Sequence, residues 1–298
     1  MIVHPDYTSA VNTKMLARVF ESLARGPVGS GVERGLNLVG LRPAGQKLYN
    51  WVLSTIAVRN GEYTISVGNA EAIFEIRSPD EYLRLKSMFE NDVLSSLLFD
   101  LNADDVLYDV GANMGLYSCL VGDIIGPNRV VAFEPHPGNA ERLHNNVNLN
   151  DLEPTIFNKA LSDEEGEVSL AVAVESHTTS PGHNLIEINE SVEEYGSESA
   201  ETISTDMVRG DNFIQTQNLP EPTVLKVDVE GAEYNVLSGL REVLSGSACR
   251  LVYCEVHRNH VETFGSSDKE VRELLESCGF ELESLNDHGT KYHLKAKK

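Results

Sequence analysis

In VLYDVGANMGLYS, residues 106–118, an apolar run contains Asp109, and Gly111 and Gly115 then precede a second apolar run. This pattern is typical of a strand that turns sharply into a helix, because glycine lets the backbone pass close to a ligand and the first amides of a helix offer hydrogen-bond donors. The glycine spacing is GxxxG, so the GxGxxG fingerprint of pyrophosphate binding is not met. A carboxylate just before the glycines repels an anion and favours a ligand that carries an ammonium group.

A second acidic residue, Glu134, follows the glycine turn at a spacing typical of nucleoside-binding folds. Glu134 ends the next apolar run, VVAFE, nineteen residues after Gly115. An acidic side chain about 20 residues beyond a glycine turn is where the ribose hydroxyls of a nucleoside cofactor are held. The pair therefore predicts a nucleoside site. Two simpler interpretations stay open: Asp109 as a helix cap, and Glu134 as a solvated strand end before Pro135.

Charged residues also occupy two later apolar runs. In TVLKVDVEGAE, residues 223–233, Lys226, Asp228 and Glu230 fall on alternate positions, which places them on one side of a strand. Burying three charges is costly unless they have partners or a function. The alternative is an internal ion pair between Lys226 and Asp228, with Glu230 and Glu233 in the first turn of a helix.

The run RLVYCEVH, residues 250–257, ends on Glu255 and His257, which likewise share one side. Ligands of open α/β sheets bind beyond the carboxyl ends of the strands. These two residues are therefore expected to meet the charged end of the preceding strand, together with Asp109 and Glu134, around one crevice.

The chain from Asp105 onward alternates apolar, β-branched runs with segments of helix length. The predicted strands are VLYDV, VVAFE, TIFNKAL, VSLAVAV, TVLKVDV and RLVYCEV, and the predicted helices lie near 115–125, 137–150, 230–245 and 268–278. This alternation predicts an α/β fold with a doubly wound, mostly parallel sheet covered on both faces. The last two runs, FELESLN and KYHLKA, flank the turn sequence DHGT and predict an antiparallel terminal hairpin.

Two domains are expected. Residues 1–100 form an N-terminal α+β extension, and residues 101–298 form the main domain with a polar, acidic insertion at 175–205. The extension is predicted to contain an amphipathic helix at Val11–Leu23, a hairpin made by EYTISVG and AIFEIRS, and a helix at 79–101. The insertion is either a mobile segment or a lid over the site.

The composition excludes several classes of protein. The 298 residues carry a formal net charge of −22, which repels DNA, RNA and anionic lipid, so no nucleic-acid partner is expected. No apolar run approaches the roughly 20 residues of a membrane span, and a soluble, cytoplasmic protein is expected, from either a halophilic cytosol or an ordinary one. The four cysteines show no metal-site spacing and are predicted to be buried, reduced thiols.

Taken together, DVGANMGLYS, FEPHPGN, NKALSDEEGEVSL, LKVDVEGAE and VYCEVH resemble the FkbM family of S-adenosylmethionine-dependent methyltransferases, over about residues 80–257. The resemblance implies a seven-stranded, Rossmann-like methyltransferase sheet and O-methylation of a hydroxyl on a sugar, glycan or natural product. The cofactor residues that it implies are Asp109, Gly111, Asn113, Gly115 and Glu134, with Ala160, Leu161 and Ser162 beside the adenine. Asn113 stands where methyltransferases at large have a glycine, a feature that the family shares. The extension and the insertion match nothing specific in it.

Methyl transfer to a hydroxyl needs a positioned acceptor oxygen and a group that takes its proton. Asp228, Glu230 and His257 are the predicted catalytic group, with His257 favoured by its ordinary pKa near 6.5. Asp228 and Glu255 are also candidate ligands for a Mg²⁺ ion that orients a diol. His177, His183 and Asn184, in the insertion, are candidate contacts to the small-molecule or glycan acceptor. The oligomeric state is left open.

Two rival functions are set beside this one. The first is a nicotinamide-dependent oxidoreductase on a similar sheet, which the GxxxG spacing disfavours. The second is a non-catalytic, nucleotide-binding subunit of a glycan-assembly complex, which the charged strand ends disfavour.

Overall fold

The structure, a computed structural model, describes residues 54, 58–87, 91–173, 185–187 and 200–298. Its contacts divide the chain into two units, which are described separately: Met1–Ile65 with Phe74–Phe89 and His177–Ser180, and Ser66–Ile73 with Glu90–Ser176 and Pro181–Lys298. The helix expected at Val11–Leu23 lies outside the described residues.

The first unit contributes a helix and part of a hairpin. Helix α4 (Pro79–Ser87) places Tyr82 edge-on against Tyr63, with ring centroids 5.0 Å apart. Strands β1 (Glu62–Val67) and β2 (Ala70–Glu75) form the expected two-stranded sheet. The helix expected at 79–101 is instead two helices, α4 and, in the second unit, α5 (Asn91–Asp100).

The second unit is built on the expected α/β sheet, which has seven strands in the order β12-β13-β11-β10-β3-β4-β5. Its strands are β3 (Leu107–Val110), β4 (Val130–Phe133), β5 (Thr155–Phe157), β10 (Val224–Val227), β11 (Leu251–His257), β12 (Glu281–Asp287) and β13 (Lys291–Lys297). The strands from β11 to β5 run parallel, and β13 is antiparallel to both β11 and β12. The mostly parallel sheet and its antiparallel terminal hairpin are thus confirmed.

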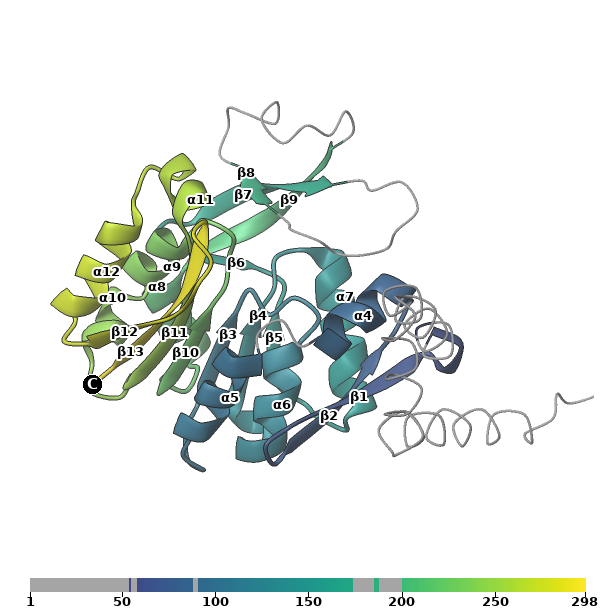
Figure 1. Cartoon of the computed structure of the whole chain (residues 1–298). Helices are drawn as coiled ribbons and strands as arrows, with labels where there is room; N and C mark the ends of the chain where they lie inside the picture. The colour runs from purple at the N-terminus through teal and green to yellow at the C-terminus, as the bar shows by residue number, and fades with distance from the viewer. Residues whose placement is uncertain (1–53, 55–57, 88–90, 174–184, 188–199) are drawn as a thin grey trace, which may run out of the picture. The chain divides into compact units, whose positions relative to one another are not determined.

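Helices cover both faces of this sheet, as Figure 1 shows. On one side lie α5, α6 (Leu116–Ile125) and α7 (Pro137–Leu149). On the other side lie α8 (Gly210–Gln217), α9 (Glu233–Gly239), α10 (Arg241–Ser245) and α12 (Asp268–Ser277). The short helices η1 (Pro127–Arg129) and α11 (Arg258–Thr263) complete the set in this unit's described residues, and α8 and α11 were not predicted.

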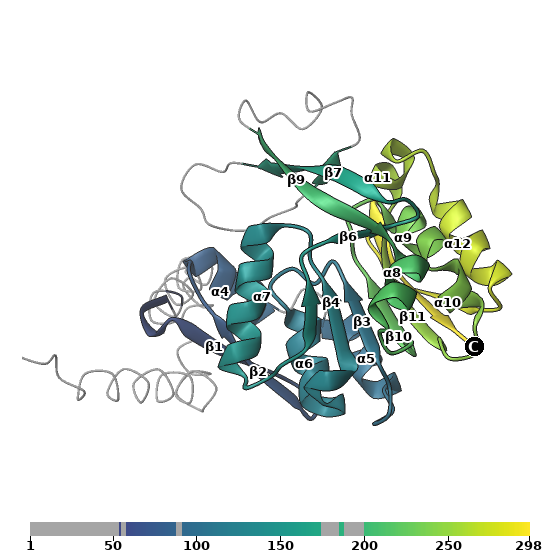
Figure 2. The ribbon, with the colours of Figure 1, turned by 180° about the vertical axis from the view of Figure 1, so that it is seen from behind.

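A smaller sheet stands beside the main one in the second unit, with β9 and β7 lying together in Figure 2. Its order is β6-β9-β7-β8, made from β6 (Ala160–Ser162), β7 (Gly166–Ala173), β8 (Leu185–Glu187) and β9 (Ala200–Arg209). The expectation that TIFNKAL is one strand, and that VSLAVAV joins the main sheet, is wrong. The chain leaves the main sheet at Asn158, whose side-chain amide donates to the carbonyls of Glu134 and Pro135.

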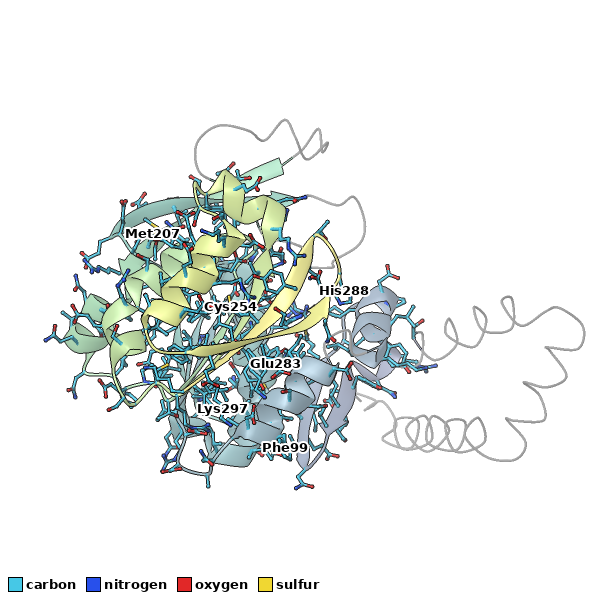
Figure 3. The ribbon with its side chains drawn as sticks, turned by 60° about the vertical axis from the view of Figure 1, so that its left-hand side comes forward. Phe99, Met207, Cys254, Glu283, His288 and Lys297 are labelled. Carbon is cyan, nitrogen blue, oxygen red and sulfur yellow. The ribbon has the colours of Figure 1, made fainter. Side chains whose placement is uncertain are left out.

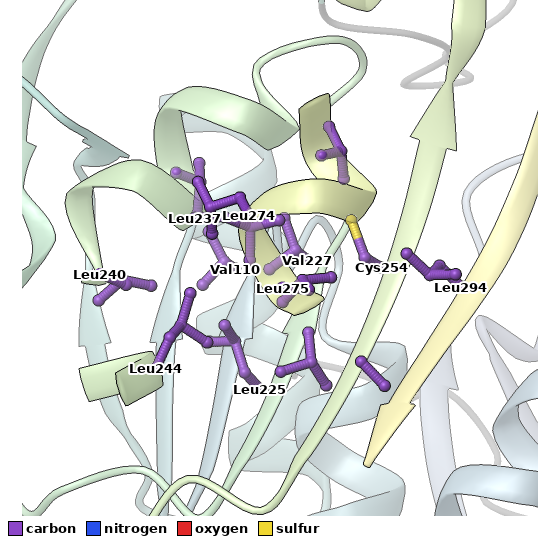
Figure 4. Close-up of a cluster of buried hydrophobic side chains, with 14 of the residues drawn as sticks. Val110, Leu225, Val227, Leu237, Leu240, Leu244, Cys254, Leu274, Leu275 and Leu294 are labelled. Carbon is purple, nitrogen blue, oxygen red and sulfur yellow. The ribbon is translucent and has the colours of Figure 1, made fainter. Parts of the chain in front are cut away.

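Apolar side chains fill the space between the sheet and the helices around α9. Figure 4 shows residues of β3, β10, β11 and β13 packed against those of α9, α10 and α12, among them Val110, Leu225, Leu237, Leu275 and Leu294. All four cysteines are buried and unpaired, as predicted. Within the described residues, no helix has both the length and the apolar character to cross a membrane. Most of the segment 175–205 lies outside the described residues, but parts of it form β8 and the start of β9.

Candidate functional site

The glycine turn between β3 and α6 is built around Asp109. Its carboxylate is fully buried, and Oδ2 accepts hydrogen bonds from the backbone N–H of Ser118 at 3.0 Å and from its hydroxyl at 2.6 Å. The backbone has positive φ at Gly111 (73°), Asn113 (52°) and Gly115 (90°). Asp109 thus accepts hydrogen bonds from the first turn of α6, as the cap interpretation predicts. The same bonds hold the glycine turn between β3 and α6.

Gly111 is required by a close approach of two chain segments. A Cβ atom on Gly111 would lie 1.9 Å from the carbonyl oxygen of Asp228, so only glycine fits there. The N–H groups of Gly111 and Ala112 both donate to the carbonyl of Phe133, at 2.9 and 3.0 Å. The turn is therefore fastened to the ends of β4 and β10, the strands on either side of β3.

Glu134 closes the other side of the turn. Its Oε2 accepts from the N–H of Asn113 at 2.7 Å, and its Oε1 accepts from the N–H of His136 at 2.9 Å and from the amide of Asn139 at 3.3 Å. Burial raises the pKa of Glu134 to about 7, although these hydrogen bonds and the charge of Lys226 oppose the shift. The two motifs that the sequence analysis paired are joined by a hydrogen bond.

Lys226 connects the turn to β10. Its Nζ lies 2.8 Å from the carbonyl oxygen of Gly111, 3.3 Å from Oδ1 of Asp109 and 3.8 Å from Oδ2 of Asp228. The expected ion pair with Asp228 is present, but the contact with Asp109 is shorter. Strand β10 ends at Val227, so the alternation expected for Asp228 and Glu230 does not continue past it, and Glu230 has a φ of 55°.

The ends of β10 and β11 bring the predicted catalytic group together. His257 is 5% exposed, with Nδ1 2.7 Å from Oε1 of the buried Glu233 and Nε2 3.2 Å from Oε2 of Glu230. Burial lowers the pKa of His257, but the hydrogen bond to Glu233 and the charges of Glu233, Glu230 and Asp228 outweigh it and raise the pKa to about 9. The imidazole therefore keeps both protons at neutral pH, contrary to the assumption of an ordinary pKa.

Glu255 of β11 completes this group. Its Oε1 lies 2.6 Å from Nζ of Lys291 and 3.8 Å from Nε2 of His293, both on β13. Burial raises the pKa of Asp228, but the charges of Lys226 and His257 with a hydrogen bond to Glu255 outweigh it and lower the pKa. One ligand atom from each of Asp228, Glu255 and His257 lies within 4.8 Å of the other two.

Other predicted residues are placed differently. Ala160, Leu161 and Ser162 form β6, buried and paired with Met207–Arg209 of β9, and their place beside an adenine stays a prediction. His177, His183 and Asn184 lie outside the described residues. The sequence analysis missed Lys291 and His293, and it gave Glu233 no functional role. The sequence contained a signal only for Lys291 and His293, because a hairpin predicted after RLVYCEV can place its second strand beside that strand.

With the geometry established, comparisons identify the family. A model described as the methyltransferase FkbM domain matches residues 109–282. Hexuronic acid methyltransferase AglP of Haloferax volcanii is 30% identical over 239 residues, which are 80% of this chain and 89% of that protein. Methyltransferase sdnD of Sordaria araneosa is 28% identical over 61% of this chain and 76% of its own.

Among solved structures, the FkbM methyltransferase of Methylobacillus flagellatus aligns with a TM-score of 0.46 and 16% identity. The alignment covers 68% of this chain and 46% of that one. The family model alone spans more than half of the 298 residues, and the Haloferax relative reaches 30% identity over 80% of them. The chain therefore belongs to the FkbM family of S-adenosylmethionine-dependent methyltransferases.

Proposed function

We propose that the protein methylates a sugar hydroxyl, and that the sugar is a hexuronic acid or a glycan that contains one. The relative with this printed activity is 30% identical and is matched over 89% of its own length. The observation that carries the proposal is the contact between Gly111 and Asp228, because it sets the cofactor turn directly against the cluster of proton-accepting side chains.

The residues of the turn fit the cofactor. Glu134 is a buried carboxylate that accepts from the N–H groups of Asn113, His136 and Asn139, and the O–H groups of a ribose are further donors to such an oxygen. Gly111 has no room for a Cβ, and the positive φ at Asn113 and Gly115 keeps the turn tight. When bound, S-adenosylmethionine supplies a methyl group whose bond to the sulfonium sulfur breaks as its bond to the acceptor oxygen forms.

The hydroxyl proton must pass to a side chain of the cluster. The pKa of His257 is raised to about 9, so at neutral pH this imidazole has no free lone pair to accept it. Asp228 has a lowered pKa and is engaged by Lys226, which makes it a weak base. Glu230 is the remaining member: its side chain is 21% exposed, so an acceptor hydroxyl can reach it, and its Oε2 lies 3.2 Å from Nε2 of His257. We assign the proton to Glu230, with Asp228 and His257 orienting the acceptor.

The cellular setting is part of the proposal. A net charge of −22 supports work in a salt-rich cytosol, where the repulsion between the acidic groups is screened. The methyltransferase domain is proposed to occupy residues 101–298, with residues 1–100 as an extension and 175–205 as an insertion.

The test is methyl transfer from isotope-labelled S-adenosylmethionine to hexuronic acid glycosides and to glycan fractions, followed by mass spectrometry. Because a hexuronic acid carries a carboxylate as well as hydroxyls, the product is then treated with mild alkali, which cleaves a methyl ester and leaves a methyl ether. A labelled product that survives alkali is expected. A labelled ester would overturn the hydroxyl assignment, and label on no sugar would overturn the acceptor class.

Variants separate binding from turnover. Glu230→Gln is expected to lower kcat by about 100-fold or more with the cofactor Kd unchanged, since general base catalysis contributes about 10²–10⁴-fold. Glu134→Ala is expected to raise the cofactor Kd. The matched control is Glu262→Gln, which changes an exposed carboxylate on α11 and should alter neither. Glu230→Gln with normal kcat would remove Glu230 from the mechanism.

A further inference from the structure

We propose that Asp228, Glu255 and His257 form a binding site for one divalent metal cation at the carboxyl ends of β10 and β11. Only the part that the cation plays in methyl transfer rests on the proposed function. The site itself rests on the geometry of the side chains.

The three residues supply a donor set that suits a cation. Asp228 follows the end of β10, whereas Glu255 and His257 alternate along β11 and so point to one side. One carboxylate oxygen from each acid and one imidazole nitrogen lie within 4.8 Å of one another. Two carboxylates suit Mn²⁺, and an imidazole suits first-row divalent metals in general, so the mixed donor set favours Mn²⁺ or a similar first-row cation over Mg²⁺.

The orientation of His257 is an independent observation. Glu233, which is fully buried, accepts the Nδ1 hydrogen at 2.7 Å and fixes the plane of the ring. Nε2 is then the nitrogen that faces the cluster, where it lies 3.2 Å from Oε2 of Glu230 and makes no hydrogen bond with the residues that the structure describes. Because a metal-bound imidazole is neutral, the cation would displace the Nε2 proton of His257 to solvent. A histidine whose other nitrogen is held by a carboxylate is the usual arrangement of a metal-ligating imidazole.

A small cavity lies beside two of the three proposed ligands. Asp228 and Glu255 line a cavity of about 10 Å³ together with Lys226 and His293, and this volume is about that of one water or one small ion. Nδ1 of His293, 7% exposed, also lacks a hydrogen bond among the described residues.

The carboxylates of the cluster outnumber its positive groups. The carboxylates are Asp228, Glu230, Glu233 and Glu255, and the positive groups are Lys226, Lys291 and the protonated His257. A divalent cation would offset this excess of negative charge, which otherwise repels an anionic sugar. Bound there, it would bind neighbouring acceptor oxygens and make a hydroxyl more acidic.

The first experiment measures Mn²⁺ binding to the full-length protein without cofactor or acceptor. Free Mn²⁺ is counted by its electron paramagnetic resonance signal, and Mg²⁺ is added as a competitor. One bound Mn²⁺ per chain is expected, with binding weakened about 10-fold or more by Asp228→Asn, Glu255→Gln or His257→Ala. Glu233→Gln changes the partner of Nδ1, the nitrogen of His257 that faces away from the proposed cation, and should weaken Mn²⁺ binding by about 10- to 100-fold.

A matched control and a measurement without variants complete the test. Glu283→Gln removes an exposed carboxylate from β12 (Figure 3) and should leave Mn²⁺ binding unchanged. In the unmodified protein, Mn²⁺ should broaden the imidazole proton resonances of His257 and His293 before those of the exposed His288. This readout holds even if a ligand variant fails to fold.

Two results would overturn the metal site: no Mn²⁺ bound at millimolar concentration, or binding that the ligand variants leave as tight as before. If the binding assay shows bound Mn²⁺ but methyl transfer continues after exhaustive chelation, the metal site stands and only the role of the cation in the reaction is overturned. Mn²⁺ binding without methyl transfer to any sugar would instead contradict the proposed function and leave the site standing.

Discussion

The ammonium group of Lys226 lies 3.3 Å from the carboxylate of Asp109, and both side chains are buried on neighbouring parallel strands. Lys226→Met would leave Asp109 with its hydrogen bonds from Ser118 but no counter-charge. Removing one partner of a buried ion pair is expected to lower the free energy of unfolding by about 3–5 kcal/mol. Urea denaturation followed by circular dichroism measures the loss.

The control for this prediction is a double-mutant cycle. Asp109→Asn with Lys226→Met removes both charges and should recover part of the stability, because no unpaired charge stays buried. Lys269→Met removes an exposed lysine that pairs with Glu273 on α12, and it should leave the free energy of unfolding nearly unchanged, because solvent screens such a pair. A loss in the double variant equal to the sum of the losses in Lys226→Met and Asp109→Asn would show that the pair is not coupled.

The raised pKa of Glu134 predicts how the affinity for S-adenosylmethionine depends on pH. Its pKa is raised to about 7 in the folded protein, from an ordinary value of 4.5, mainly by burial. Its contribution to stability is therefore fully present below the unfolded pKa and is lost as the pH rises through about 7. Ribose hydroxyls donate to the ionised carboxylate, so S-adenosylmethionine affinity should increase over the same interval.

Calorimetric titrations on both sides of neutral pH check this prediction. Glu134→Gln should bind more weakly and lose the step near neutral pH, whereas Glu141→Gln, an exposed change on α7, should keep it. If the affinity of the unmodified protein for S-adenosylmethionine does not depend on pH, the ionised carboxylate of Glu134 does not accept hydrogen bonds from the cofactor.

The sequence was enough to predict the main sheet, because its strands are apolar, β-branched and separated by helix-length segments. It was not enough to predict which sheet each strand joins. TIFNKAL looks like one strand, but the bonds from Asn158 to the carbonyls of Glu134 and Pro135 divide it between two sheets. Those bonds depend on the neighbouring strand β4, so no local pattern reports them.

The site was predictable to the extent that parallel strands end at one edge of a sheet. That rule brought Asp228 near the glycine turn and near His257. It could not show that Glu233 contacts His257, because the two are separated by 24 positions and one of them lies in a helix. The pairing of Glu255 with His293 depends on the register of β13 against β11, which the turn sequence does not specify.

Gly111→Ala tests the close approach between the turn and β10. The added Cβ would meet the Asp228 carbonyl at 1.9 Å, and the φ of 73° is itself unfavourable for alanine. A loss of about 3 kcal/mol or more in stability is expected from strain and overpacking combined. Gly265→Ala has a similar φ of 77° with nothing within 4 Å, so it should cost only about 1 kcal/mol. Similar losses for the two variants would show that backbone strain alone requires Gly111.

The net charge of −22 predicts that salt stabilises the fold. Repulsion between acidic groups is screened over a Debye length of about 10 Å at 0.1 M salt and about 3 Å at 1 M. The Tm should therefore rise steeply with the first additions of KCl and more slowly beyond them. Exclusion of salt from apolar surface would instead give a gradual rise that continues at molar concentration. A Tm that does not change over the dilute range would show that repulsion is not what limits the stability of this chain.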